Sequence, residues 1–276
     1  MKIATQTNSW LVAKGSNLGI SQIVGDTISD GLSYTNRKHM VGVSICTYGC
    51  VNNNNLLERC STERRIANYQ THLIHTNQNV KTFNPNFNHF LMVDNGTTYL
   101  PDQEYAFRIK FLDAVSKYTP SSKNDPFSNI DQSDNSESSP RIAPVSNIVV
   151  GGNLSVFDAV SCSVISQIPC ILVQNSGNAA DFIIDLITSA PSRFALYNDK
   201  QKKNYIEKFI LMSGNSFLKN VKNSITKAKF EDFKEDAIEI LNAKHLIRWI
   251  EISPGSLARD AEDSIMDSIF ACENPV

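Results

Sequence analysis

Long apolar runs and an excess of positive charge are both missing from this sequence. No uninterrupted apolar stretch approaches the about 18 residues of a membrane-spanning helix, and the N-terminus lacks the apolar core of a secretory signal. The 26 Lys and Arg residues are balanced by 28 Asp and Glu residues, which gives a net charge of −2. We therefore expect no direct membrane insertion by this chain and no nucleic-acid partner.

The standard signatures of nucleotide and metal sites are missing too. The sequence contains neither the G-x-G-x-x-G of a dinucleotide-binding loop nor the G-x-x-x-x-G-K-[ST] of a P-loop. Cys46 and Cys50 have no second cysteine pair at the spacing of a zinc site. The five histidines form no nucleophile–base pattern. We expect no metal site and no required cofactor.

Segments typical of strands alternate with segments of helical periodicity through most of the chain. The predicted strands are 9–15, 39–49, 89–96, 146–152 and 168–177. The predicted helices between and after them are 19–32, 104–118, 154–167 and 179–190. In the first helix, Ile20, Ile23, Val24 and Ile28 recur at helical spacing. Such alternation predicts an α/β fold with a Rossmann-like parallel sheet flanked by helices.

Three other segments set the predicted domain organisation. The Asn-rich stretch 51–88 is assigned mostly to loop, and 119–146 is rich in Ser, Asn, Asp and Pro, a composition typical of a disordered insertion. Beyond residue 198 strand signals disappear, and 200–214 and 233–252 have the pattern of amphipathic helices. We therefore predict an α/β domain over 1–198 and a helical appendage over 199–276.

Four of the predicted strands end in turns rich in Gly, Ser, Thr and Asn. Because parallel strands end at the same edge of a sheet, these turns are expected to gather there and offer backbone N–H groups to a phosphate. The alternative is that each turn uses these residues only for its geometry or as a helix cap. The candidate nucleotide-binding residues in the turns are Gly15, Ser16, Asn17, Gly19, Gly96, Thr97, Gly151, Gly152, Ser176, Gly177 and Asn178.

The same segments carry a family resemblance. "WLVAKGSNLGISQIVG", "VGVSICTYGCVNNNNLL", "HFLMVDNGTT", "NIVVGGNLSV" and "IPCILVQNSGNAADFI" occur in order and resemble motifs of the N-terminal homology region of melastatin-type transient receptor potential (TRPM) cation channels. That region is a SLOG-type nucleotide-sensing fold. The resemblance implies a regulatory domain on the cytoplasmic face of a membrane channel that is a homotetramer when complete. It also implies a ligand such as ADP-ribose, bound in the cleft formed by the glycine turns.

Carried over residue by residue, the resemblance adds two cations to the candidate site. Arg108 matches a family arginine that grips phosphate, although it is also spaced to pair with Glu104 one helical turn earlier. Lys14 stands where the family has glycine: either it supplies charge in its place, or its β-carbon crowds the backbone approach that glycine permits. Two departures remove contacts: the family's tyrosine after the D-N-G-T-T turn falls at Pro101, and its G-S-G-R arginine is Asn178. Tyr99 and Tyr105 are possible replacements for the missing ring.

Two other functions are also consistent with the sequence. A ligand-free scaffold that helps to assemble the channel would also fit the lost arginine and tyrosine. An enzyme of the phosphoribohydrolase type would need a carboxylate near the ribose, and Asp158 is the nearest one, a position away from where that pattern places its glutamate. We expect no enzymatic activity.

Overall fold

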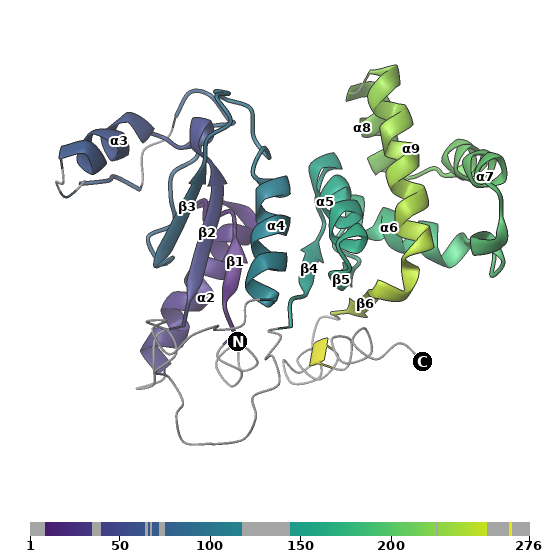
Figure 1. Cartoon of the computed structure of the whole chain (residues 1–276), viewed down its shortest axis with the longest axis horizontal. Helices are drawn as coiled ribbons and strands as arrows, with labels where there is room; N and C mark the ends of the chain where they lie inside the picture. The colour runs from purple at the N-terminus through teal and green to yellow at the C-terminus, as the bar shows by residue number, and fades with distance from the viewer. Residues whose placement is uncertain are drawn as a thin grey trace. The chain divides into compact units, whose positions relative to one another are not determined.

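The computed structural model describes residues 9–34, 40–63, 66, 68–71, 75–117, 144–224, 226–252 and 265–266. The chain divides into two compact units, Met1–Arg108 and Ile109–Val276. Each unit contains one three-stranded parallel sheet, with the strand orders β1-β2-β3 and β4-β5-β6. Figure 1 labels the elements of both units.

The first unit begins with the strand–turn–helix sequence that its N-terminal residues predict. β1 (Leu11–Ala13) leads through a glycine-bearing turn into α2 (Gly19–Tyr34), and β2 (Gly42–Thr47) pairs with β1 so that Val12 lies opposite Val43. A short 3-10 turn, η1 (Tyr48–Cys50), and α3 (Asn54–Glu63) follow β2. β3 (His89–Val93) pairs with the other side of β2, and α4 (Tyr105–Ser116) follows it.

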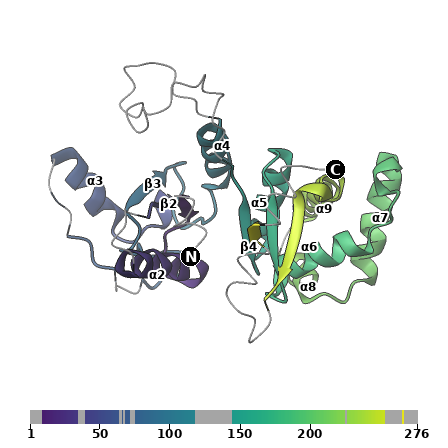
Figure 2. The same ribbon diagram turned by 90° about the horizontal axis from the view of Figure 1, so that it is seen from below.

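The second unit repeats the alternation and then adds helices. Its first half contains β4 (Asn147–Val150), α5 (Leu154–Ile165), β5 (Cys170–Gln174) and α6 (Asn178–Ser189). Its second half contains η2 (Phe194–Leu196), α7 (Asp199–Met212), α8 (Ser216–Ser224), α9 (Lys227–Asn242), η3 (Lys244–Leu246) and β6 (Ile247–Glu251). β6 lies parallel beside β5 and completes the sheet (Figure 2).

The two units have cores of very different extent. In the second unit, β5 is buried on both faces, as its apolar run predicts, because Cys170, Ile171 and Leu172 are all completely buried. One large apolar cluster joins the sheet to α5, α6, α7, α8 and α9, with the rings of Phe157, Phe182 and Phe233 among its members. The first unit has a small cluster built on Ile28, Met40 and Phe87.

The predicted α/β class, its parallel strands and the order of its alternating elements are confirmed, with the strands in two three-stranded sheets. Three local expectations are wrong. Segment 51–88 contains the helix α3, and the predicted helix 233–252 ends at Asn242 and gives way to β6. In α2 only part of the expected apolar face is buried, because Ile20 and Ile23 are exposed while Ile28 is buried.

Two predictions fall partly outside the described residues or stay predictions. Of the predicted insertion 119–146, only 144–146 are described, and they form no helix or strand. The predicted domain boundary after residue 198 lies inside the second unit, where α9 packs on α5 and α7.

Across the described residues, no helix combines the length and the apolar character that crossing a bilayer requires.

Candidate ligand site

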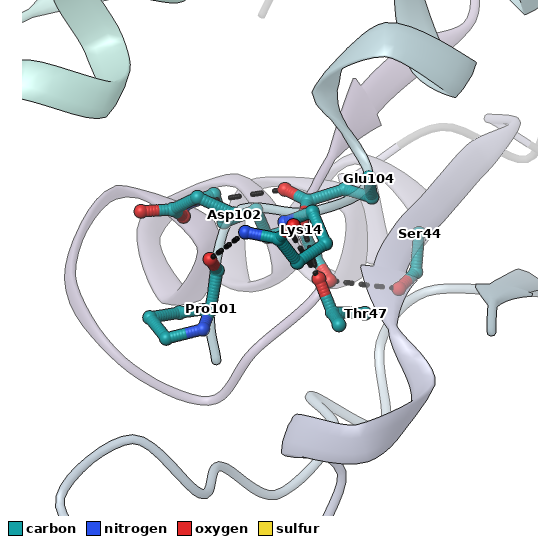
Figure 3. A network of polar contacts seen from close by, with 7 residues as sticks. Lys14, Ser44, Thr47, Pro101, Asp102 and Glu104 are labelled. Carbon is teal, nitrogen blue, oxygen red and sulfur yellow. Dashed lines mark hydrogen bonds and ion pairs between the residues drawn. The ribbon is translucent and has the colours of Figure 1, made fainter. Parts of the chain in front are cut away.

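Polar side chains gather where the three strands of the first sheet end. Lys14 follows β1, Thr47 is the last residue of β2, and Asp102 and Glu104 lie in the turn that leads from β3 into α4. The strands are parallel, so their carboxyl ends meet at one edge, which is where ligands of open α/β sheets bind. Figure 3 shows these side chains together.

Hydrogen bonds and an ion pair connect these residues into one network. The Lys14 ammonium is paired with the Asp102 carboxylate and lies 4.0 Å from Glu104 Oε1. The Thr47 hydroxyl donates to Glu104 Oε2 over 2.7 Å and accepts from the Gln103 backbone N–H over 3.1 Å. The end of β2 therefore fixes the orientation of the Glu104 side chain.

Glu104 is a buried carboxylate with an unused acceptor. It is only 1% exposed, and its Oε1 has no hydrogen-bond partner among the described residues. Burial alone would lower the pKa of Lys14, but Tyr105, Asp102 and Glu104 outweigh that effect and raise the pKa above its usual value. Lys14 therefore stays charged, as the nearest cation to Glu104 Oε1 in this network.

The structure brings the two predicted cations, Lys14 and Arg108, to the same aromatic ring. The Lys14 ammonium lies 5.0 Å and the Arg108 guanidinium 4.4 Å from the ring centroid of Tyr105, within the range of cation–π contacts. The alternative reading paired Arg108 with Glu104. In the structure the Glu104 carboxylate instead faces Thr47 and Lys14.

The turn after β1 is tied to residues 82–84. Asn17 N–H donates to the Thr82 carbonyl over 2.9 Å, Asn84 N–H donates to the Gly15 carbonyl over 2.8 Å, and Ser16 forms a β-bridge with Phe83. Gly15 itself is packed so closely that a β-carbon there would lie 2.0 Å from Ser44 Oγ, whereas Gly19 has open space beside it. Much of this turn is therefore explained by the fold alone.

The turn after β3 also uses its own side chains to fix its backbone. Gly96 N–H donates to the Asp94 carboxylate over 2.8 Å, so Asp94 stabilises the turn. Thr97 donates from its N–H and its hydroxyl to the Asn95 side-chain oxygen, over 3.1 and 2.7 Å. These N–H groups are already bonded within the turn.

In the second unit, the predicted phosphate-binding turns are bonded to one another. At the start of α6, Ala179 and Ala180 N–H donate to the carbonyls of Gly152 and Gly151, over 3.1 and 3.0 Å. Gly177 N–H donates to the Asp181 carboxylate in the first turn of the helix. Ser176 Oγ accepts from Gly151 N–H over 2.7 Å. The N-terminus of α6 is thus largely satisfied by the chain's own oxygen atoms.

A pocket of about 510 Å³ lies beside these turns. Its lining combines two predicted residues, Gly152 and Asn178, with five that sequence reasoning missed: Asn153, Leu154, Phe217, Asn220 and Val221. All seven are uncharged, so the lining offers amide groups and apolar surface but no cation for a phosphate. The three residues from α8 carry no local signal, because only the packing of that helix brings them to the sheet edge.

Neither a metal site nor the enzyme alternative gains support from this geometry. Among the residues placed in the structure, no group of three or more His, Cys, Asp or Glu side chains is arranged to hold a metal ion. Asp158 is exposed on α5 and is not part of the lining of the pocket. A catalytic carboxylate needs to reach the scissile bond, so this position does not favour a phosphoribohydrolase.

The family model and the similar curated proteins all indicate the same family. Residues 1–228 match the sequence model of the family described as SLOG in TRPM. Similar curated proteins are transient receptor potential cation channel subfamily M member 2 of Mus musculus (22% identical over 73% of this chain) and member 6 of Homo sapiens (27% over 66%). Another is subfamily M member-like 2 of Nematostella vectensis, 23% identical over 66% of this chain.

The chain spans only a small part of these relatives, 12% of the mouse, 8% of the human and 11% of the Nematostella protein. Sequence identity with these relatives is low, but the family match covers most of the chain, including the first sheet and strands β4 and β5 of the second. On this evidence, the chain belongs to the SLOG-in-TRPM family.

Proposed function

We propose that this chain is the cytosolic ligand-sensing region of a TRPM-like cation channel and binds ADP-ribose or a related nucleotide. The observation that carries the proposal is the convergence of Lys14 and Arg108 on Tyr105 at the carboxyl edge of the first sheet. Two cations beside an aromatic ring offer charge to a phosphate and a flat face to a base. The complete channel would be a homotetramer, as in the family resemblance.

The proposed role of this region is to couple ligand binding to the pore of the channel. A ligand can shift a channel between two conformations only if it binds one of them more tightly. In this proposal a nucleotide at the first sheet edge supplies that difference in affinity, and the pore lies in a part of the channel that this sequence does not include.

Calorimetric titration with ADP-ribose tests the proposal. We expect saturable binding that Arg108→Ala weakens by roughly 10- to 100-fold, since a hydrogen bond to a charged group contributes about 1.5–3 kcal/mol. The matched control is Lys110→Ala, which removes a cation from the exposed side of the same helix. Equal affinity of the Arg108→Ala variant and the wild-type protein would refute the assigned site.

A ligand-free scaffold is the second candidate, and one observation favours it. The N–H groups of the predicted phosphate-binding turns largely donate to the chain's own carbonyls and carboxylates. If this candidate is right, wild-type protein will produce no heat of binding at millimolar ADP-ribose, AMP or cyclic ADP-ribose.

A further inference from the structure

We propose that Asp102 is an internal competitor for the ligand, because its carboxylate occupies the position beside Lys14 that an anionic ligand group would take. This inference rests on the proposed function, since it concerns the regulation of the same site. The contact that carries it is the ion pair between Lys14 and Asp102, which joins the turn after β1 to the turn before α4.

The formal charges at this edge cancel. Lys14 and Arg108 supply two positive charges beside Tyr105, and Asp102 and Glu104 supply two negative charges beside Lys14. A phosphate that arrives while both carboxylates are in place meets no net attraction. Removing one carboxylate from the cluster leaves a net positive charge, which favours an anion.

Of the two carboxylates, Asp102 is the one that can leave. The Glu104 side chain is 2% exposed and is held by the Thr47 hydroxyl. The Asp102 side chain is 12% exposed and is paired with Lys14. Rotation of Asp102 toward solvent would free the Lys14 ammonium while Glu104 keeps its hydrogen bond.

The site therefore alternates between two arrangements with one cation in common. In the closed arrangement Lys14 pairs with Asp102, as the structure has it. In the open arrangement Lys14 and Arg108 share the ligand phosphate, and Asp102 is hydrated. Ligand affinity is then set by a competition between two anions for one lysine, and any ligand without a strong anionic group fails to open the site.

The variant Asp102→Asn tests this competition directly. The substitution keeps the size of the side chain, and asparagine is among the few residues that adopt the left-handed backbone that Asp102 has at φ +69. We expect at least about tenfold tighter binding of ADP-ribose by calorimetry. The matched control is Asp113→Asn, which removes the α4 carboxylate from an ion pair with Lys117, 2.6 Å long. It should leave the affinity unchanged.

Labelling of Lys14 by acetic anhydride, followed by mass spectrometry, tests the contact without any ligand. Loss of the Asp102 carboxylate removes one of the interactions that raise the pKa of Lys14, so more free amine is present and labelling becomes faster. We expect faster labelling of Lys14 in Asp102→Asn and wild-type labelling in Asp113→Asn.

The outcomes separate this inference from the proposed function. Wild-type binding that depends on Arg108, with no gain in Asp102→Asn, would overturn the competition and leave the proposed function intact. Binding by Asp102→Asn with none by wild-type protein would support the competition in its strongest form. No binding by either protein would overturn both.

Discussion

Gly15 occupies a position where a side chain would collide with the neighbouring strand. A β-carbon there would lie 2.0 Å from Ser44 Oγ, and the backbone is left-handed with φ +67. We expect Gly15→Ala to lower the free energy of unfolding by about 2–4 kcal/mol, because steric overlap adds to backbone strain. Gly19→Ala serves as the control: it has φ +57 but open space, and should cost only about 1–2 kcal/mol. Urea denaturation of both variants measures the difference, and equal losses would contradict the packing argument.

Cys46 gives the fold a pH dependence at alkaline pH. Burial, followed by the nearby charge of Glu104, raises the pKa of Cys46 to about 12 from a usual value of 9.0. Between these values the folded chain holds a proton that the unfolded chain has lost, so stability falls as the pH rises. The loss is up to about 1.4 kcal/mol per pH unit.

Cys46→Ser removes this titration, so the wild-type protein should lose stability relative to the variant as the pH increases from 8 to 10. Urea denaturation at each pH measures that difference. A difference that stays constant over the range would show that the thiol is not held protonated by the fold.

Among the elements, α9 depends on an aromatic contact with α5. Phe233 is 1% exposed, and its ring centroid lies 4.5 Å from that of Phe157. We expect Phe233→Ala to destabilise the protein by about 3–5 kcal/mol, because it leaves a cavity in the main core. The matched control is Phe230→Ala, one turn earlier on the same helix. Phe230 is only partly buried, so this variant should lose clearly less stability. Thermal or urea unfolding measures the stability of both variants. A larger loss of stability in Phe230→Ala than in Phe233→Ala would contradict the assigned core.

Element prediction succeeded where one local pattern dominated and failed where distant packing decided. The apolar run of β5 identified a strand covered on both faces, and its residues are indeed buried. β6 was missed because its sequence continues the apolar period of α9, and only pairing with β5 makes it a strand. Helix α3 was missed because the segment around it is Asn-rich, a composition typical of loops.

The candidate site was predicted to a similar degree. Lys14 and Arg108 entered the candidate site through the family resemblance, and the structure places both beside the Tyr105 ring. Asp102 gave no such signal, because its role depends on a contact with Lys14 that only the folded turn creates. The α8 residues of the pocket were missed for the same reason.

At the scale of the whole molecule, the two units differ in the size of their cores. β2 and β5 are each the central strand of their sheet, which makes them a matched pair. β5 belongs to the large cluster, while the cluster beside β2 is small. We expect amide hydrogen exchange, followed by mass spectrometry, to be faster in peptides covering Gly42–Thr47 than in those covering Cys170–Gln174. Equal protection would show that both units open together.

The left-handed backbone of Asp102 also has an evolutionary consequence. At φ +69 an aspartate is conformationally strained, and glycine is the residue that adopts this geometry without strain. Aspartate and glycine codons differ by a single base, so one mutation can delete the carboxylate and relax the turn in the same step. Under the proposed competition, the sensitivity of this site to anions is therefore a property that a lineage can gain or lose quickly, without rebuilding the sheet that supports it.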